Sequence, residues 1–106
     1  MALISNMQHF LDEYGVIPAE MPGPVRNIAL FLGAIVAWVT VRQVTHDEQT
    51  NVPCRRSPNR RRCSGTIYAG VAADAATIVW ECPVCGDTGM ISGWEGTPWD
   101  RRNRPH

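Results

Sequence analysis

The sequence predicts an α+β domain in which one or two N-terminal helices pack on a small antiparallel sheet of three to four strands. Three observations predict this fold class. Apolar residues recur at helical spacing in the first part of the chain, and β-branched and aromatic residues form short runs in the second part. The 106 residues leave room for one domain. Helices that precede the strands, instead of alternating with them, favour the α+β class.

Two segments have the apolar spacing of helices. Residues 5–14 predict a short amphipathic helix that ends at Gly15. A second helix is predicted from Pro24 to Trp38, and Pro24 suits its first turn because proline supplies no amide hydrogen there. Apolar residues surround nearly the whole second helix, so we expect other elements to cover more than one of its sides. The β-branched residues 39–41 could extend this helix or begin a strand.

Runs of β-branched and aromatic residues predict the sheet. Residues 65–72 and 76–82 are two such runs, and the short segment between them predicts a hairpin. Residues 90–94 predict a third short strand. Residues 49–53 predict an edge strand, because Pro53 has no amide hydrogen for a ladder.

The composition is that of a folded domain, with 44% hydrophobic and 19% charged residues. We expect one domain over residues 1–106, with a helical part at 1–45, a cysteine-bearing strand part at 49–95 and a frayed tail at 96–106. The first residues lack the pattern of a signal peptide, so a cytoplasmic location is expected. No membrane partner is expected, because the uncharged stretch within the second helix is shorter than the about 20 residues of a spanning helix.

Four cysteines are arranged as two pairs, Cys54-x8-Cys63 and Cys82-x2-Cys85. The second pair lies in the motif Cys-Pro-Val-Cys-Gly. A two-residue gap lets both thiolates reach one tetrahedral ion from a tight turn, and Gly86 tolerates the positive φ with which the chain leaves that turn. Predicted strands enter and leave the motif. This pattern is typical of a metal-binding knuckle.

The cysteine pairs predict a structural zinc site. In a reducing compartment, four cysteines indicate a metal more often than two disulfides. The alternatives are a site with three cysteines and His46, a redox Cys-x-x-Cys pair, and thiols that bind nothing. The predicted Zn²⁺ ligands are Cys54, Cys63, Cys82 and Cys85.

Two segments resemble a family of small uncharacterised bacterial proteins with a zinc-ribbon-like C-terminal half. They are the arginine-rich run from Cys54 to Cys63 and residues 80–100, WECPVCGDTGMISGWEGTPWD. The resemblance covers about half the chain. It implies bound zinc, a sheet of the zinc-ribbon type and a bacterial cytoplasm, and it implies no reaction. Zinc ribbons usually have a second Cys-x2-Cys knuckle, whereas eight residues separate Cys54 from Cys63 here.

The net charge is zero, but the ten basic residues are all arginine and five of them lie between the first two cysteines. Arginine binds phosphate oxygens bidentately and stacks on bases, so this loop predicts nucleic-acid binding. Trp94 or Trp99 could add base stacking, although covering of the sheet is favoured for both, and Trp38 and Trp80 are expected in the core. An acidic protein, another anion, or the chain's own acids are the alternative partners of the loop. Its arginines are Arg55, Arg56, Arg60, Arg61 and Arg62.

No catalytic site is predicted. His9, His46 and His106 are scattered, and their spacing suggests no pairing with a cysteine or serine nucleophile. Four thiolates on zinc would leave no open coordination position for hydrolysis. We therefore expect a binding module and no small-molecule substrate. The alternative function is a protein-interaction or assembly module, including a homo-oligomer, that uses the apolar helix 24–38.

Overall fold

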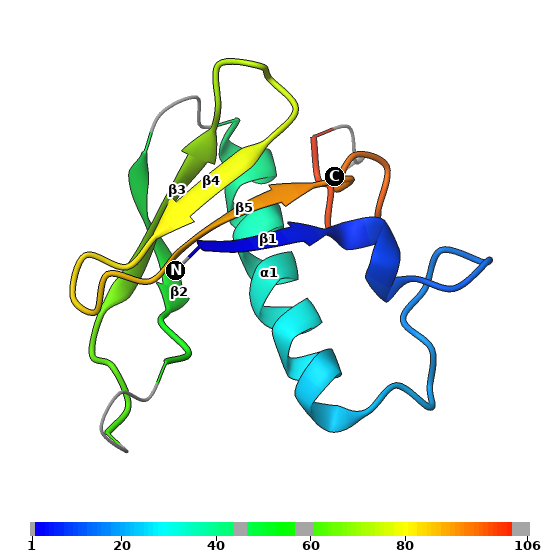
Figure 1. Cartoon of the computed structure of the whole chain (residues 1–106). Helices are drawn as coiled ribbons and strands as arrows, with labels where there is room; N and C mark the ends of the chain where they lie inside the picture. Colours follow the sequence, from blue (N-terminus) through cyan, green and yellow to red (C-terminus); the bar gives the residue numbers. More distant parts are fainter. Residues whose placement is uncertain (1, 44–46, 57–60, 103–106) are drawn as a thin grey trace.

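The chain forms a five-stranded mixed sheet with one long helix packed behind it (Figure 1). This computed structural model describes residues 2–43, 47–56 and 61–102. The elements are β1 (Ala2–Asn6), the 3-10 helix η1 (Met7–Phe10), α1 (Gly23–Arg42), β2 (Glu48–Pro53), β3 (Thr66–Val71), β4 (Ile78–Glu81) and β5 (Thr88–Ser92). The predicted α+β class is confirmed. The sheet has one strand more than the three to four expected, and it is not wholly antiparallel.

The antiparallel part of the sheet follows the order β5-β4-β3-β2. The three strands predicted within residues 65–94 correspond to β3, β4 and β5. A turn at Asp74 joins β3 to β4, and its carboxylate accepts hydrogen bonds from the N–H groups of Ala76 and Thr77, both at 2.9 Å. β2 is an edge strand, as predicted, and its register with β3 shifts between Gln49 and Pro53.

The prediction of a helix at residues 5–14 is wrong. Residues 2–6 form β1, which pairs in parallel with β5 at the other edge of the sheet, and η1 follows directly. Asn6 caps η1 by accepting a hydrogen bond from the N–H of Gln8 at 2.9 Å. Met7 is fully buried, so the apolar residues of this segment do reach the core, but from a strand and one short turn. The edge of β5 offers hydrogen-bond partners to the backbone of residues 2–6, and this pairing outweighs the helical spacing of the apolar residues.

The predicted helix at 24–38 is confirmed and extends to Arg42. The β-branched residues 39–41 continue it, because Val39 and Thr40 are buried and the Thr40 hydroxyl donates to the carbonyl of Val36 at 2.8 Å. A left-handed residue, Gln43, ends the helix with φ of 53°. The length and apolar composition of α1 would also suit a membrane-spanning helix, but the core helix of a soluble protein has the same properties. In this fold, 39% of the most apolar 18-residue stretch of α1 is buried.

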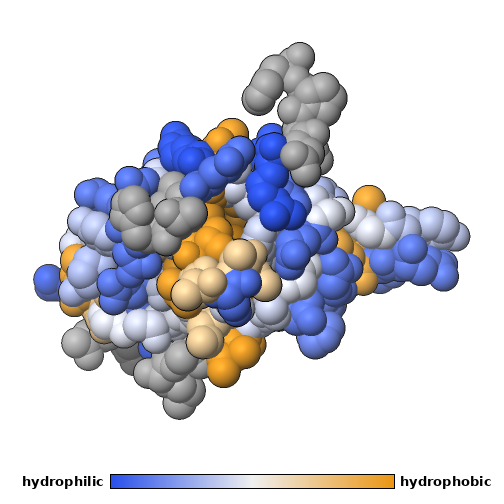
Figure 2. All heavy atoms as spheres, turned by 90° about the horizontal axis from the view of Figure 1, so that it is seen from above, coloured by the Kyte–Doolittle hydropathy of each residue, from blue (hydrophilic) through white to orange (hydrophobic). Residues whose placement is uncertain are grey.

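The core lies between α1 and the sheet. Buried side chains of the helix, including Leu32 and Ile35, meet buried residues of the central strands. Phe31 contacts Trp80 edge to face, with ring centroids 5.4 Å apart, so the core position predicted for Trp80 is confirmed. Trp38 is half-buried and packs against the core's edge. Viewed from the top of Figure 1, exposed hydrophobic residues gather in a band in the middle of the molecule, with hydrophilic residues around it (Figure 2).

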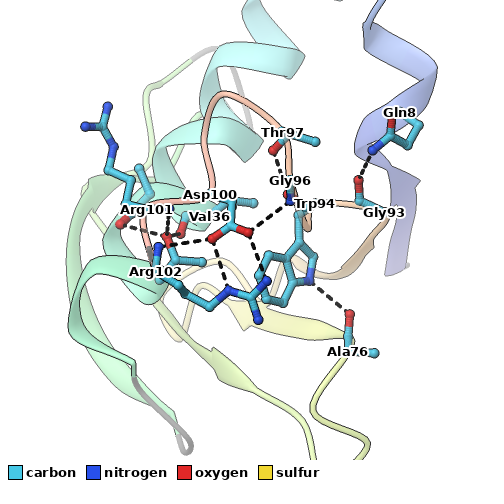
Figure 3. Close-up of polar contacts among 12 residues, drawn as sticks. Gln8, Val36, Ala76, Gly93, Trp94, Gly96, Thr97, Asp100, Arg101 and Arg102 are labelled. Atoms are coloured by element: carbon cyan, nitrogen blue, oxygen red, sulfur yellow. Dashed lines mark hydrogen bonds and ion pairs between the residues drawn. The ribbon is translucent and has the colours of Figure 1, made fainter. Parts of the chain in front are cut away.

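The segment after β5 folds back across the helix and sheet (Figure 3). Asp100 accepts two hydrogen bonds from the guanidinium of Arg102 at 3.1 and 2.9 Å and one from the N–H of Gly96 at 3.0 Å. The N–H of Arg101 donates to the hydroxyl of Thr40 at 3.0 Å, which ties the segment to α1. We expected the tail at 96–106 to fray, yet these contacts order it as far as Arg102. Residues 103–106 lie outside the described residues.

Candidate metal centre

The four cysteines meet at one end of the sheet. Cys54 follows β2, Cys63 precedes β3, and Cys82 and Cys85 lie in the turn between β4 and β5. Their sulfur atoms all lie within 4.8 Å of one another. All four thiols are free. The chain therefore brings together four cysteines, far apart in sequence, that could hold a metal ion.

The sulfur separations fit a tetrahedral ion. The sulfurs of Cys54 and Cys85 are 3.7 Å apart, and those of Cys63 and Cys82 are 3.6 Å apart. With Zn–S bonds of about 2.3 Å, tetrahedral geometry sets the sulfur separation at about 3.8 Å. These short contacts each join one pair to the other, so the Cys-x-x-Cys motif is part of a four-sulfur cluster and not an isolated redox pair. His46, the ligand of the three-cysteine alternative, lies outside the described residues.

Backbone hydrogen bonds form the knuckle at the second pair. The N–H of Cys82 donates to the carbonyl of Asp87, and the N–H of Gly86 donates to the carbonyl of Cys82, both at 2.8 Å. Gly86 has φ of 80°, the left-handed conformation for which its lack of a side chain is suited. The turn predicted from the Cys-Pro-Val-Cys-Gly motif thus exists, and it aims both thiols of the pair at the cluster.

The first pair reaches the cluster by a different route. The N–H of Cys54 donates to the carbonyl of Gly65 at 3.0 Å, and the N–H of Cys63 donates to the carbonyl of Arg56 at 2.8 Å. These two bonds draw the ends of the arginine loop together. Eight intervening residues are therefore compatible with a shared site, because the loop returns its ends to the same place.

Gly65 is a site residue that sequence reasoning missed. Its N–H donates to the sulfur of Cys63 at 3.3 Å, and a side-chain carbon at this position would overlap the sulfur of Cys82. Gly65 therefore supports one sulfur and leaves space for another. A glycine two residues after a predicted ligand, at the start of a strand, is the sequence feature that could have indicated it.

The thiols differ in burial and in their ease of ionisation. Cys54, Cys63 and Cys82 are buried, and Cys85 is exposed. Burial raises the pKa of Cys54 to about 12. For Cys63, the N–H of Gly65 lowers the pKa, but burial and the neighbouring thiols leave it raised.

Cys82 shifts in the opposite direction. Burial acts to raise its pKa, but hydrogen bonds from the backbone at Cys85 and Val84 outweigh this effect and leave the pKa lowered. The knuckle therefore favours a thiolate at Cys82, whereas binding of a metal would have to displace the protons of Cys54 and Cys63.

The predicted nucleic-acid residues separate into two groups. Arg55, Arg56, Arg61 and Arg62 are exposed at the two ends of the loop beside the cluster, and Arg60 lies outside the described residues. The guanidinium carbon of Arg55 lies 5.6 Å from the centroid of the Phe31 ring. The chain thus presents exposed arginines at both ends of the loop, next to Cys54 and Cys63.

The two tryptophans assigned to base stacking belong to the core instead. Trp94 is 1% exposed, and its indole N–H donates to the carbonyl of Ala76 at 2.9 Å (Figure 3). Arg102 covers the Trp94 ring at 4.5 Å. Trp99 is half-buried and lies so close to Gly33 that a side chain there would overlap it. Stacking of Trp94 on a base is therefore wrong, and covering of the fold, which we favoured for both, is what the structure has.

Comparisons with protein-family models, with curated proteins and with solved structures find no match to this chain. The resemblance to zinc-ribbon-like bacterial proteins accordingly stays a prediction. The class that fold and site define is an α+β domain with a four-cysteine cluster able to hold a metal ion.

Proposed function

We propose that this chain is a structural zinc module that binds nucleic acid through the arginines beside its metal centre. Zinc is the metal because four thiolates at tetrahedral spacing suit it, and because a closed four-sulfur site contributes directly to folding. Such a site has no open position for substrate, which supports a role in binding and not in catalysis. A reducing bacterial cytoplasm would keep the thiols available for metal.

The observation that carries the nucleic-acid proposal is the position of the arginines. Cys54 and Cys63 close the loop, and four exposed arginines, at 55, 56, 61 and 62, flank these two residues. The ion pair found among the described residues joins Arg102 to Asp100, so the chain's acids do not neutralise these four side chains there. Exposed guanidinium groups that make no ion pair among the described residues can bind successive phosphates.

Metal content and folding should be measured first. Native mass spectrometry of protein purified without added metal is expected to show one zinc per chain. Circular dichroism after a strong chelator is expected to show loss of strand signal, because the arginine loop and the knuckle both depend on the cluster. Protein that holds no metal, or that keeps its spectrum after zinc is removed, would contradict the structural zinc site.

Nucleic-acid binding is tested by fluorescence anisotropy with labelled single- and double-stranded oligonucleotides. Four phosphate contacts predict that affinity falls about a hundredfold between about 50 and 200 mM salt. Replacing Arg61 and Arg62 with glutamine should weaken binding and reduce the salt dependence, whereas replacing Arg26, whose guanidinium donates to the carbonyls of Pro18 and Ala19, should not. Absence of binding at low salt would refute the proposal.

A second function is supported by the outer face of α1. Leu30 and Val41, which lie eleven residues or about three turns apart on one side of α1, are 51% and 48% exposed, so the helix that we expected to be covered on more than one side keeps apolar residues at the surface. This face could pack on a protein partner or on a second copy of the chain. Sedimentation velocity at high salt tests self-association: a dimer that Leu30→Glu converts to a monomer would support it, and a monomer at all concentrations would exclude a homo-oligomer.

A further inference from the structure

A cavity of about 480 Å³ lies between the first turns of α1 and the two ends of the arginine loop. Its volume is in the range of small-molecule sites. The helix contributes two apolar side chains and one amide to its lining, and the loop contributes two arginines. The residues that line it are Pro24, Asn27, Ile28, Arg55 and Arg62.

The described residues of the lining carry positive charge and no negative charge. Two of its five residues are arginines, and none is acidic. No hydrogen bond or ion pair within the described ranges 2–43, 47–56 and 61–102 engages either guanidinium group. Two guanidinium groups that line one cavity and make no hydrogen bond or ion pair can both donate to one multivalent oxyanion.

The helix side of the cavity adds further donors. α1 has no acidic residue in its first turn and no side-chain cap, so the positive end of its dipole is uncompensated. The amide of Asn27, one turn into the helix, can donate to an oxygen in the cavity. These groups supplement the two arginines.

We propose that this cavity binds a phosphate group through Arg55, Arg62 and Asn27. Ile28 and Pro24 would contact the organic part of a phosphate ester, for which the volume leaves room. The phosphate could come from the end or backbone of a nucleic acid or from a free phosphate ester. The inference rests on the same loop as the proposed function and deepens it, by separating two arginines of a phosphate site from two that act by charge alone.

The metal centre positions this site. Arg55 directly follows Cys54, and Arg62 directly precedes Cys63. The sulfurs of these cysteines belong to the cluster, so a bound metal fixes the backbone beside both guanidinium groups. Phosphate binding should therefore weaken when the metal is removed.

The test uses the full zinc-loaded chain and inorganic phosphate, followed by amide and arginine side-chain NMR signals. Phosphate is expected to shift the signals of Asn27, Arg55 and Arg62 saturably at millimolar concentration. Arg62→Gln should weaken binding about tenfold, which is the loss expected for hydrogen bonds to a charged group. Arg61→Gln, the neighbouring arginine that does not line the cavity, should change it less than about twofold.

A second variant and a second ligand separate the possible outcomes. Asn27→Asp places a carboxylate in the cavity and should abolish phosphate binding while all arginines remain. If oligonucleotides bind but phosphate does not saturate by about 20 mM, or if Arg61→Gln and Arg62→Gln weaken phosphate binding equally, the cavity is not a phosphate site. If phosphate binds but oligonucleotides do not, the cavity proposal stands with a small phosphate ester as its ligand, and the nucleic-acid proposal fails.

Discussion

Replacement of Gly65 by alanine adds one carbon atom beside the metal centre and tests whether the cluster depends on the space that this glycine leaves. Gly65 lies against the cluster, and a side-chain carbon there would overlap the sulfur of Cys82. The same carbon would lie 3.0 Å from the Cβ and Cγ2 atoms of Val84, a contact that a shift of a few tenths of an ångström in this 63% exposed residue can relieve. The sulfur of Cys82 cannot move without leaving the tetrahedron. The substitution should therefore weaken metal binding.

The expected size follows from the cost of overpacking. Adding one carbon to a filled site costs about 1–3 kcal/mol. If this strain falls on the metal-bound state, zinc affinity decreases about 5- to 150-fold. Gly65 keeps its N–H in the variant, so the hydrogen bond to the sulfur of Cys63 at 3.3 Å is not removed.

Zinc affinity is measured by competition with a chromophoric chelator of known affinity. Gly23→Ala is the matched control, because a carbon added there contacts nothing within 4 Å. The control should bind zinc within about twofold of the unmodified chain. Equal zinc affinity for Gly65→Ala and Gly23→Ala would show that Gly65 does not constrain the cluster, and the arrangement of sulfurs described above would then be incorrect.

Three further results are expected. Trp94→Phe removes the indole N–H that donates to Ala76 at 2.9 Å and part of a ring that is 1% exposed, so urea denaturation should show a loss of about 1–3 kcal/mol. Burial acts to raise the pKa of Asp100, but hydrogen bonds from Arg102 and a backbone N–H leave the pKa lowered. The ionised carboxylate therefore stabilises the fold above about pH 4, and this stabilisation is lost as pH falls through the lowered pKa. The NMR signal of the Trp94 indole should report this acid transition, and Asp100→Asn should abolish it. A transition that is unchanged in the variant would show that Asp100 is not the group responsible. Because burial raises the pKa of Cys54 to about 12, zinc must displace its proton, and zinc affinity measured between about pH 6 and pH 8 should rise with pH.

The parts of the fold that depend on local sequence were predictable. The knuckle needs only the spacing of Cys82 and Cys85 and a glycine that accepts φ of 80°, and all of these lie within five consecutive residues. The helix at 24–38 and the three central strands follow from apolar periodicity in the same way. Approach of Cys54 to the cluster depends on a hydrogen bond to Gly65, which spacing alone does not encode.

The parts that depend on distant partners were not predictable. Residues 5–14 have helical spacing, and only the open edge of β5 turns the first of them into a strand. Covering of the sheet was favoured for Trp94, but its partner, the carbonyl of Ala76 that accepts the indole N–H, could not be named from the sequence. In both cases the missing information is a contact between residues far apart in the chain.

The parallel pairing of β1 with β5 also sets an order of events during synthesis. Ala2 pairs with Thr88, a separation of 88 − 2 = 86 residues, whereas the β3 and β4 hairpin closes at Val71 and Ile78. The hairpin can form on the ribosome as soon as it emerges, but β1 has no edge to join until β5 has been made. During that interval the apolar segment around Ile4 is an unpaired strand, open to chaperones and to aggregation, and its docking is expected to complete folding only after translation of β5.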